Sequence, residues 1–185
     1  KLEGQGDQMD FERLDAQLSG GGKLLGKGRW QKNQLSLDLQ AAELDAASLV
    51  SRLRSSRLNG PLAATLSIDQ QAIQTTLSDP RFSLKIDARH AAGTVSLPSL
   101  ELSAGSSLLK ASGELQLDKQ MPFKLTGELS RFDPSRFIKA PAALINSHFK
   151  GQGKLEPRPQ VDAHVEISDS RLAGEVLAGQ GYIRI

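Results

Sequence analysis

Apolar and polar residues alternate along most of this chain. Leu35, Leu37 and Leu39 are separated by polar residues, and segments 123–129 and 161–167 show the same period. Because successive side chains of a β-strand point to opposite faces, each such segment predicts a strand with one apolar and one polar face. The chain is therefore predicted to be all-β, with antiparallel strands that share a single apolar side.

Turn-forming residues divide this pattern into short segments, for example at Asp79-Pro80 and Ala92-Gly93. Most gaps are short enough for hairpins, so consecutive strands should pair antiparallel in a meander. Native twist and glycines within strands favour bending, which predicts an elongated curled sheet, a half-pipe with a hydrophobic interior. The expected strands span residues 11–18, 23–31, 34–42, 58–68, 71–78, 81–89, 92–97, 99–104, 107–117, 121–131, 147–156, 160–168, 170–177 and 179–185.

Two segments interrupt the strand pattern with helical signals. In the first, residues 45–53, Asp45 suits the N-cap position. In the second, residues 133–138, Asp133 precedes Pro134, a residue favoured at the first helical position. Two short helical inserts are therefore expected. The apolar stripe of the first insert consists of Leu49, Val50 and Leu53.

The inserts also suggest an internal repeat. Asp133 follows Asp45 by roughly 88 positions, and Gly151 follows Gly60 by roughly 91 positions. This long period predicts a stacked architecture. The expected organisation is a loosely matching segment 1–25, a first β-repeat module 26–110 and a second module 111–185.

Composition narrows the class of protein. The chain has 185 residues, 38% of them hydrophobic and 4% aromatic, and its formal net charge is +2 with interleaved signs. No lysine- and arginine-rich block with aromatic residues is present, which argues against a nucleic-acid partner. No apolar run approaches about 18 residues, so no membrane-spanning helix is expected. The alternating segment 181–185 ends without a turn, so we expect a segment of a longer β-rich protein.

Candidate catalytic and metal-binding groups are sparse. Residues 19–23 contain three glycines and a lysine but lack the order of a phosphate-binding loop. His164 shares a strand face with Asp162 and Glu166, yet that face is the polar one, which favours a solvated exterior over a metal site. We therefore expect no enzyme activity, no cofactor and no metal.

Four segments resemble the TamB family, part of the AsmA-like superfamily of Gram-negative envelope proteins. They are residues 111–117, 123–129, 132–137 and 149–155, and the sharpest is Phe-Asp-Pro-Ser-Arg-Phe followed by a glycine-containing strand. The resemblance covers the chain from about residue 26 onward. It does not include the membrane anchor or the extreme C-terminal region of the family.

The resemblance implies a periplasmic location, with the full-length protein anchored in the inner membrane by a segment outside this chain. It implies a taco-shaped sheet with a hydrophobic groove. It also implies two roles, the transport of phospholipid between the two membranes and the assembly of outer-membrane proteins. A TamA-like barrel protein of the BamA family would be the partner, through regions outside this chain.

Three hypotheses follow for the apolar side of the sheet. It could shield lipid acyl chains, act as a chaperone-like module that binds nascent strands of outer-membrane proteins and autotransporters, or form the dry core of a structural β-sandwich. The predicted groove-lining residues are Leu35, Leu37, Leu39, Leu62, Leu66, Ile68, Phe82, Leu84, Ile86, Val95, Leu97, Leu100, Leu102, Leu115, Leu117, Phe123, Leu125, Leu129, Val161, Val165 and Ile167.

Overall fold

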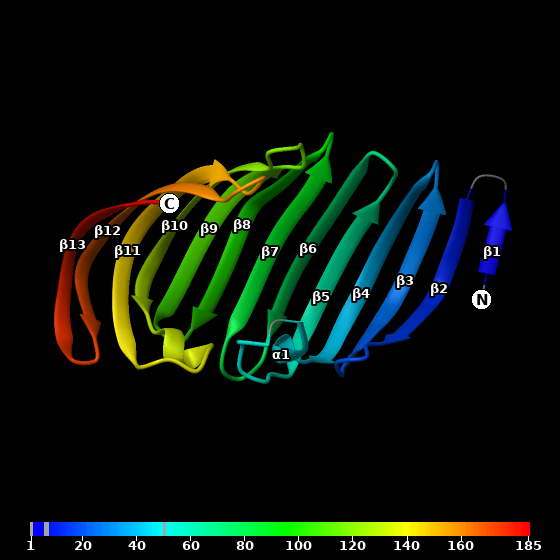
Figure 1. Ribbon diagram of the computed structural model, residues 1–185. Helices are drawn as coiled ribbons and strands as arrows, with labels where there is room; N and C mark the ends of the chain where they lie inside the picture. Colours follow the sequence, from blue (N-terminus) through cyan, green and yellow to red (C-terminus); the bar gives the residue numbers. More distant parts are fainter. Residues whose placement is uncertain (1, 6–7, 50) are drawn as a thin grey trace.

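A computed structural model describes residues 2–5, 8–49 and 51–185 as one open antiparallel sheet. Within these residues thirteen strands follow one another in chain order, each hydrogen-bonded to the next, and the ribbon curves along its length (Figure 1). The predicted all-β antiparallel meander is therefore confirmed. The strands are β1 (Leu2–Gln5), β2 (Gln8–Gln17), β3 (Lys23–Gln31), β4 (Gln34–Leu44), β5 (Leu58–Leu66), β6 (Gln70–Ser78), β7 (Ser83–Ala91), β8 (Thr94–Ala104), β9 (Ser107–Gln116), β10 (Pro122–Phe132), β11 (Ala143–Lys154), β12 (Gln160–Leu172) and β13 (Glu175–Arg184).

The strand register divides the side chains between two faces. Leu37 lies opposite Ala64 and Leu39 lies opposite Leu62, and residues directly opposite each other in an antiparallel pair share a face. When directly opposite residues are assigned to the same face in each successive strand pair, one mainly apolar face extends from β2 to β13. Charged pairs such as Lys85 and Glu101, whose Nζ and Oε1 atoms are 3.2 Å apart, occupy the other face. All strands of the described chain belong to this one sheet, so a two-sheet sandwich is not formed.

Bulges bend several strands and explain where the strand predictions fail. Residues 92–97 and 99–104 were expected as two strands, but a register shift between Leu97 and Leu100 carries Pro98 within the single strand β8. A second shift, between Ile167 and Ser170, extends β12 to Leu172. The turn therefore falls at residues 173–174 and β13 begins earlier than expected. β1 was not predicted.

The inserts are shorter than expected. The first contains α1 (Ala46–Leu49), of only four residues, and the second contains the 3₁₀ turn η1 (Pro134–Arg136). Asp133 caps η1 as predicted, since its carboxylate accepts a hydrogen bond from the backbone N–H of Ser135 at 3.1 Å. Val50, part of the predicted helical stripe, lies outside the described residues.

The two inserts dock against each other although about 80 residues separate them. Leu53 and Ile138 form an isolated β-bridge, and the backbone N–H of Arg54 donates to the carbonyl oxygen of Phe137 at 2.7 Å. The Phe137 ring stacks on Phe132 with centroids 5.2 Å apart. Together the inserts cover one end of the apolar face. The buried cluster there comprises Ala41, Leu44, Ala46, Leu58, Leu77, Phe82, Ala104 and Phe137.

A repeated local structure precedes each insert. Glu43 and Arg131 both have positive φ, 55° and 46°, at a bulge two residues before the capping aspartate. Each backbone N–H donates to an asparagine side-chain oxygen on the following strand, Asn59 at 3.1 Å and Asn146 at 2.7 Å. The repeat therefore pairs Asn59 with Asn146.

The glycine pairing expected for this repeat is wrong. Gly60 lies opposite Ala41, which precedes the bulge of β4, whereas Gly151 lies opposite Leu125, far from the bulge of β10. The residue that corresponds to Gly60 in the second unit is Ser147, opposite Leu129. An asparagine that ties down a bulge is thus a better marker of the unit than a strand glycine.

Candidate functional site

The apolar face is the first of two candidate sites. The chain has an accessible area of 12396 Å², whereas a compact protein of 19.9 kDa would expose about 8,700 Å². The excess follows from the single-layer architecture, because no second sheet packs on the described strands. Away from the inserts, the apolar side chains contact mainly one another and solvent.

Most of the predicted lining residues lie together on this face. Leu35, Leu62, Ile86, Leu115 and Val165 belong to five different strands and are joined by the register across the sheet. Leu125 lies near the middle of β10 and is 41% exposed. A sizeable share of this face is therefore accessible from solvent.

Two predicted lining residues lie elsewhere. Ile68 falls in the turn between β5 and β6 and is 87% exposed, so it does not join the face. Phe82 precedes β7 and is buried, with its ring edge-on to Phe137 at a centroid distance of 5.7 Å. Phe82 therefore belongs to the core beneath the inserts.

The register adds members that alternation alone did not select. Ile73 lies opposite Ala64, Phe149 lies opposite Gly127, and Leu109 lies opposite Leu129. Ile73 and Phe149 sit in segments with a weaker apolar period, whereas Leu109 is in phase with Leu115 and Leu117 of the predicted strand 107–117 and could have been selected from the sequence. Gln71 and His90, opposite each other on the same face, give it a polar margin.

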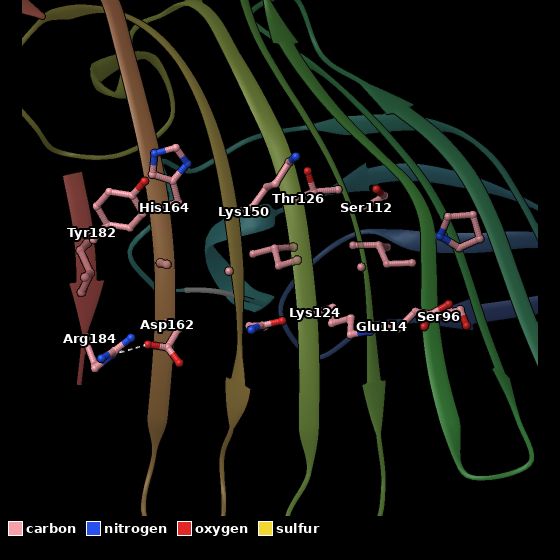
Figure 2. Close-up of a pocket in the computed structure, with 18 of the residues that line it drawn as sticks. Ser96, Ser112, Glu114, Lys124, Thr126, Lys150, Asp162, His164, Tyr182 and Arg184 are labelled. Atoms are coloured by element: carbon pink, nitrogen blue, oxygen red, sulfur yellow. Dashed lines mark hydrogen bonds and ion pairs between the residues drawn. The ribbon is translucent and has the colours of Figure 1, made fainter. Parts of the chain in front are cut away.

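A second candidate site lies on the polar face and was not anticipated from the sequence. It is a hollow of about 1290 Å³ that extends from β7 to β13. Each of β9 to β13 contributes two polar-face side chains and, between them, one residue of the apolar face. In Figure 2 the side chains form two rows, one of His164, Lys150, Thr126 and Ser112, the other of Arg184, Asp162, Lys124, Glu114 and Ser96.

Charge in this hollow is only partly paired. Arg184 Nε lies 2.7 Å from Asp162 Oδ1, and this hydrogen bond raises the pKa of Arg184. His164 stacks on Tyr182 with ring centroids 4.5 Å apart, and its Nε2 atom is buried without a hydrogen-bond partner. Within the described residues no cluster of three metal-ligating side chains is found. The hollow is thus a mixed-charge surface formed by neighbouring strands between β7 and β13.

Two aspartates organise the inserts that cover the apolar face. Asp45 Oδ1 accepts hydrogen bonds from the backbone N–H groups of Ser56 (2.9 Å) and Ala47 (3.0 Å), and these lower the pKa of Asp45. Burial opposes ionisation of Asp133, but hydrogen bonds from Ser135 and Ala143 outweigh it and the net pKa of Asp133 is lowered. Both carboxylates therefore act as charged acceptors that close their loops.

Comparisons with protein-family models, with curated proteins and with solved structures find no match for this chain. The resemblance to the TamB family therefore stays a prediction. None of the described helices has the length and apolar character needed to cross a membrane.

Proposed function

We propose that the apolar face binds the acyl chains of phospholipids and shields them from water. The observation that carries this proposal is a largely aliphatic face that runs across the sheet from β2 to β13 and that the described residues cover at one end. Burial of apolar surface is favourable by about 25 cal/mol per Å². An acyl chain that lies on half-exposed leucines removes both its own surface and theirs from water, so both contribute to the free energy of binding. Flexible aliphatic side chains suit a flexible aliphatic ligand.

The inserts determine which part of the apolar face can bind an acyl chain. Phe137 and its neighbours block the apolar face at the insert end, whereas the middle of the face, where Leu125 lies, stays accessible. A bound acyl chain would therefore lie along the strands or across them, away from the insert end. A charge within the face would oppose binding, because burying an unpaired charge is costly.

The biological setting of this proposal rests on the sequence resemblance. As a TamB-like segment, the chain would act in the periplasm, within a protein that carries phospholipid from the inner to the outer membrane. Its TamA-like partner would dock through regions outside this chain. Assembly of outer-membrane proteins is the alternative role that the same resemblance implies.

Leu125→Asp tests the proposal, with Thr126→Asp as the matched control. The two positions are adjacent and exposed, but they point to opposite faces of β10. Leu125→Asp should weaken binding of a fluorescent phospholipid to the purified protein at least tenfold, while Thr126→Asp changes it less than twofold. Circular dichroism checks that both variants fold. Equal binding by the two folded variants would contradict the proposal.

A further inference from the structure

Basic residues gather on the two segments that contain the inserts. These segments are residues 45–57, between β4 and β5, and residues 133–142, between β10 and β11, and both lie along the lower edge of the ribbon in Figure 1. They carry four arginines and one lysine against two aspartates, a formal charge of +3, whereas the whole chain carries +2. The bulge residues that precede the capping aspartates, Glu43 and Arg131, are oppositely charged and cancel. The excess positive charge of the chain therefore comes from the insert segments.

The bridge between the inserts brings two of these cations together. Its antiparallel partners are Leu53 and Ile138. In an antiparallel pair the residue before one partner lies beside the residue after the other, so Arg52 and Lys139 lie on the same side of the bridge. Both are exposed, and neither forms an ion pair with a carboxylate of residues 2–5, 8–49 or 51–185. Like charges side by side destabilise a fold, and a bound anion relieves that repulsion.

Three arginines extend this pair into a patch. Arg54 Nε donates to the carbonyl oxygen of Ser135 at 2.9 Å, so the Arg54 guanidinium lies on the second insert beside Arg136. Arg81, in the turn between β6 and β7, donates to the carbonyl oxygen of Ser55 and so reaches the first insert. The side chains of Arg81 and Arg136 are 50% and 46% exposed. We call these five cations the basic patch: Arg52, Arg54, Arg81, Arg136 and Lys139.

The carboxylates of this region point inward. Asp45 and Asp133 each accept backbone hydrogen bonds that close their own loops. The side chain of Asp79 is only 2% exposed and accepts the backbone N–H groups of Arg81 and Phe82. Asp79 and Asp133 also pair with Arg81 and Arg136 of the basic patch, at 2.8 Å and 3.7 Å. The outer surface of the inserts therefore presents mainly positive charge.

The form of the basic patch suits a surface of many anions more than one small anion. Two hollows lie on the polar face, one across β7 to β13 and one across β2 to β4, and no described insert residue lines either of them. The five cations are exposed on the outside of the inserts instead. Clusters of four to eight basic residues of this kind are typical of sites that bind anionic lipid headgroups.

We propose that the basic patch docks the protein on a bilayer surface that carries anionic phospholipid headgroups. The arginines pair with headgroup phosphates, which the planar guanidinium group can bind through two hydrogen bonds. Arg52 and Lys139 acquire there the anion that the described chain does not give them. The charge argument needs only the patch and not the apolar face, and the choice of phospholipid among anionic surfaces rests on the proposed function.

Vesicle sedimentation with the whole chain tests this proposal. Vesicles of equal parts phosphatidylcholine and phosphatidylglycerol present anionic headgroups, and vesicles of phosphatidylcholine alone are the neutral control. A basic residue near an anionic surface contributes roughly fivefold to binding, so we expect the anionic vesicles to bind at least about tenfold more tightly. The difference should vanish between about 0.1 M and about 1 M salt, because the Debye length falls from about 10 Å to about 3 Å.

The double variant Arg52→Gln with Lys139→Gln removes the pair of like charges and should weaken binding of anionic vesicles at least about tenfold. The matched control is Lys119→Gln with Arg158→Gln, two exposed cations in the β9–β10 and β11–β12 turns at the opposite ends of the strands. It removes the same net charge and should change binding less than about threefold. Arg52→Lys with Lys139→Arg keeps both charges and should bind as the wild type does.

Three results would overturn the proposal: equal binding of anionic and neutral vesicles, equal weakening by the two charge-removing variants, or binding that does not fall with salt. Tighter binding of polyglutamate than of anionic vesicles would assign the basic patch to an acidic protein instead. A failure of acyl-chain binding is distinguishable, because Leu125→Asp should leave sedimentation with anionic vesicles nearly unchanged. Conversely, Arg52→Gln with Lys139→Gln should still bind the fluorescent phospholipid.

Discussion

Single carboxylates hold the two inserts in place. Asp45 and Asp133 each accept two backbone hydrogen bonds, one near the start of the loop and one about ten residues later, at Ser56 and Ala143. A neutral carboxylic acid is a weaker acceptor than a carboxylate, so these loops are tightest when both aspartates are ionised.

The inserts should therefore loosen in acid. The folded-state pKa of each aspartate is lowered, so the stability it contributes is fully present above the unfolded value, about pH 4, and is lost as pH falls through the folded pKa. Asp133→Asn keeps a capping side chain but removes this titration. Between pH 5 and pH 3 the wild type should lose more of its free energy of unfolding than Asp133→Asn, as measured by urea denaturation. Parallel losses would show that Asp133 does not act as a charged acceptor.

At the scale of elements, the docked inserts are the best-packed part of the described chain. Phe137 is 4% exposed and contacts both Phe82 and Phe132. Truncation of a buried phenylalanine to alanine typically costs about 3–5 kcal/mol, from lost burial and the cavity left behind.

Phe137→Ala should therefore destabilise the protein by about 3 kcal/mol in urea denaturation. Its effect should be local at first, because the buried cluster beneath the inserts draws its described members from the inserts and the central strands. Hydrogen exchange should accelerate at Arg54, whose N–H bonds to Phe137, while amides of β12 keep their protection. Uniform acceleration across all strands would contradict a separable insert layer.

Strand alternation was sufficient to predict the fold class but not its irregularities. A period of two follows directly from strand geometry, so β4 could be located closely from Leu35, Leu37 and Leu39. A bulge breaks that period without ending the strand, which is why β8 and β12 were each divided. No local residue pattern distinguishes such a bulge from a turn.

The two candidate sites also differ in how far they could be predicted from the sequence. The apolar face is a repeated local pattern, so most of its members could be predicted. Phe82 could not be placed, because its burial depends on Phe137, more than 50 residues later. The polar hollow depends on register and curvature across β7 to β13, which no single segment contains. Arg89 and Arg184 line it together although they are far apart in sequence.

At the scale of the whole molecule, the described chain is a single curved layer with a covered end and open edges (Figure 1). In a one-layer sheet the apolar face is exposed to water unless another molecule or a further layer covers it. The central claim is that lipid acyl chains do so. A second layer of protein would protect the same leucines equally well, so the test must identify the molecule in contact.

Site-specific photocrosslinking tests this claim most directly. A photoreactive residue placed at Leu115, Leu125 or Val165 reports from the apolar face, and one at Gln116 or Glu128 reports from the polar face of the same region. With phospholipid vesicles present, the account predicts lipid adducts, identified by mass spectrometry, at the three apolar positions and none at the two polar ones. Protein adducts alone, or no adduct at any apolar position, would contradict it.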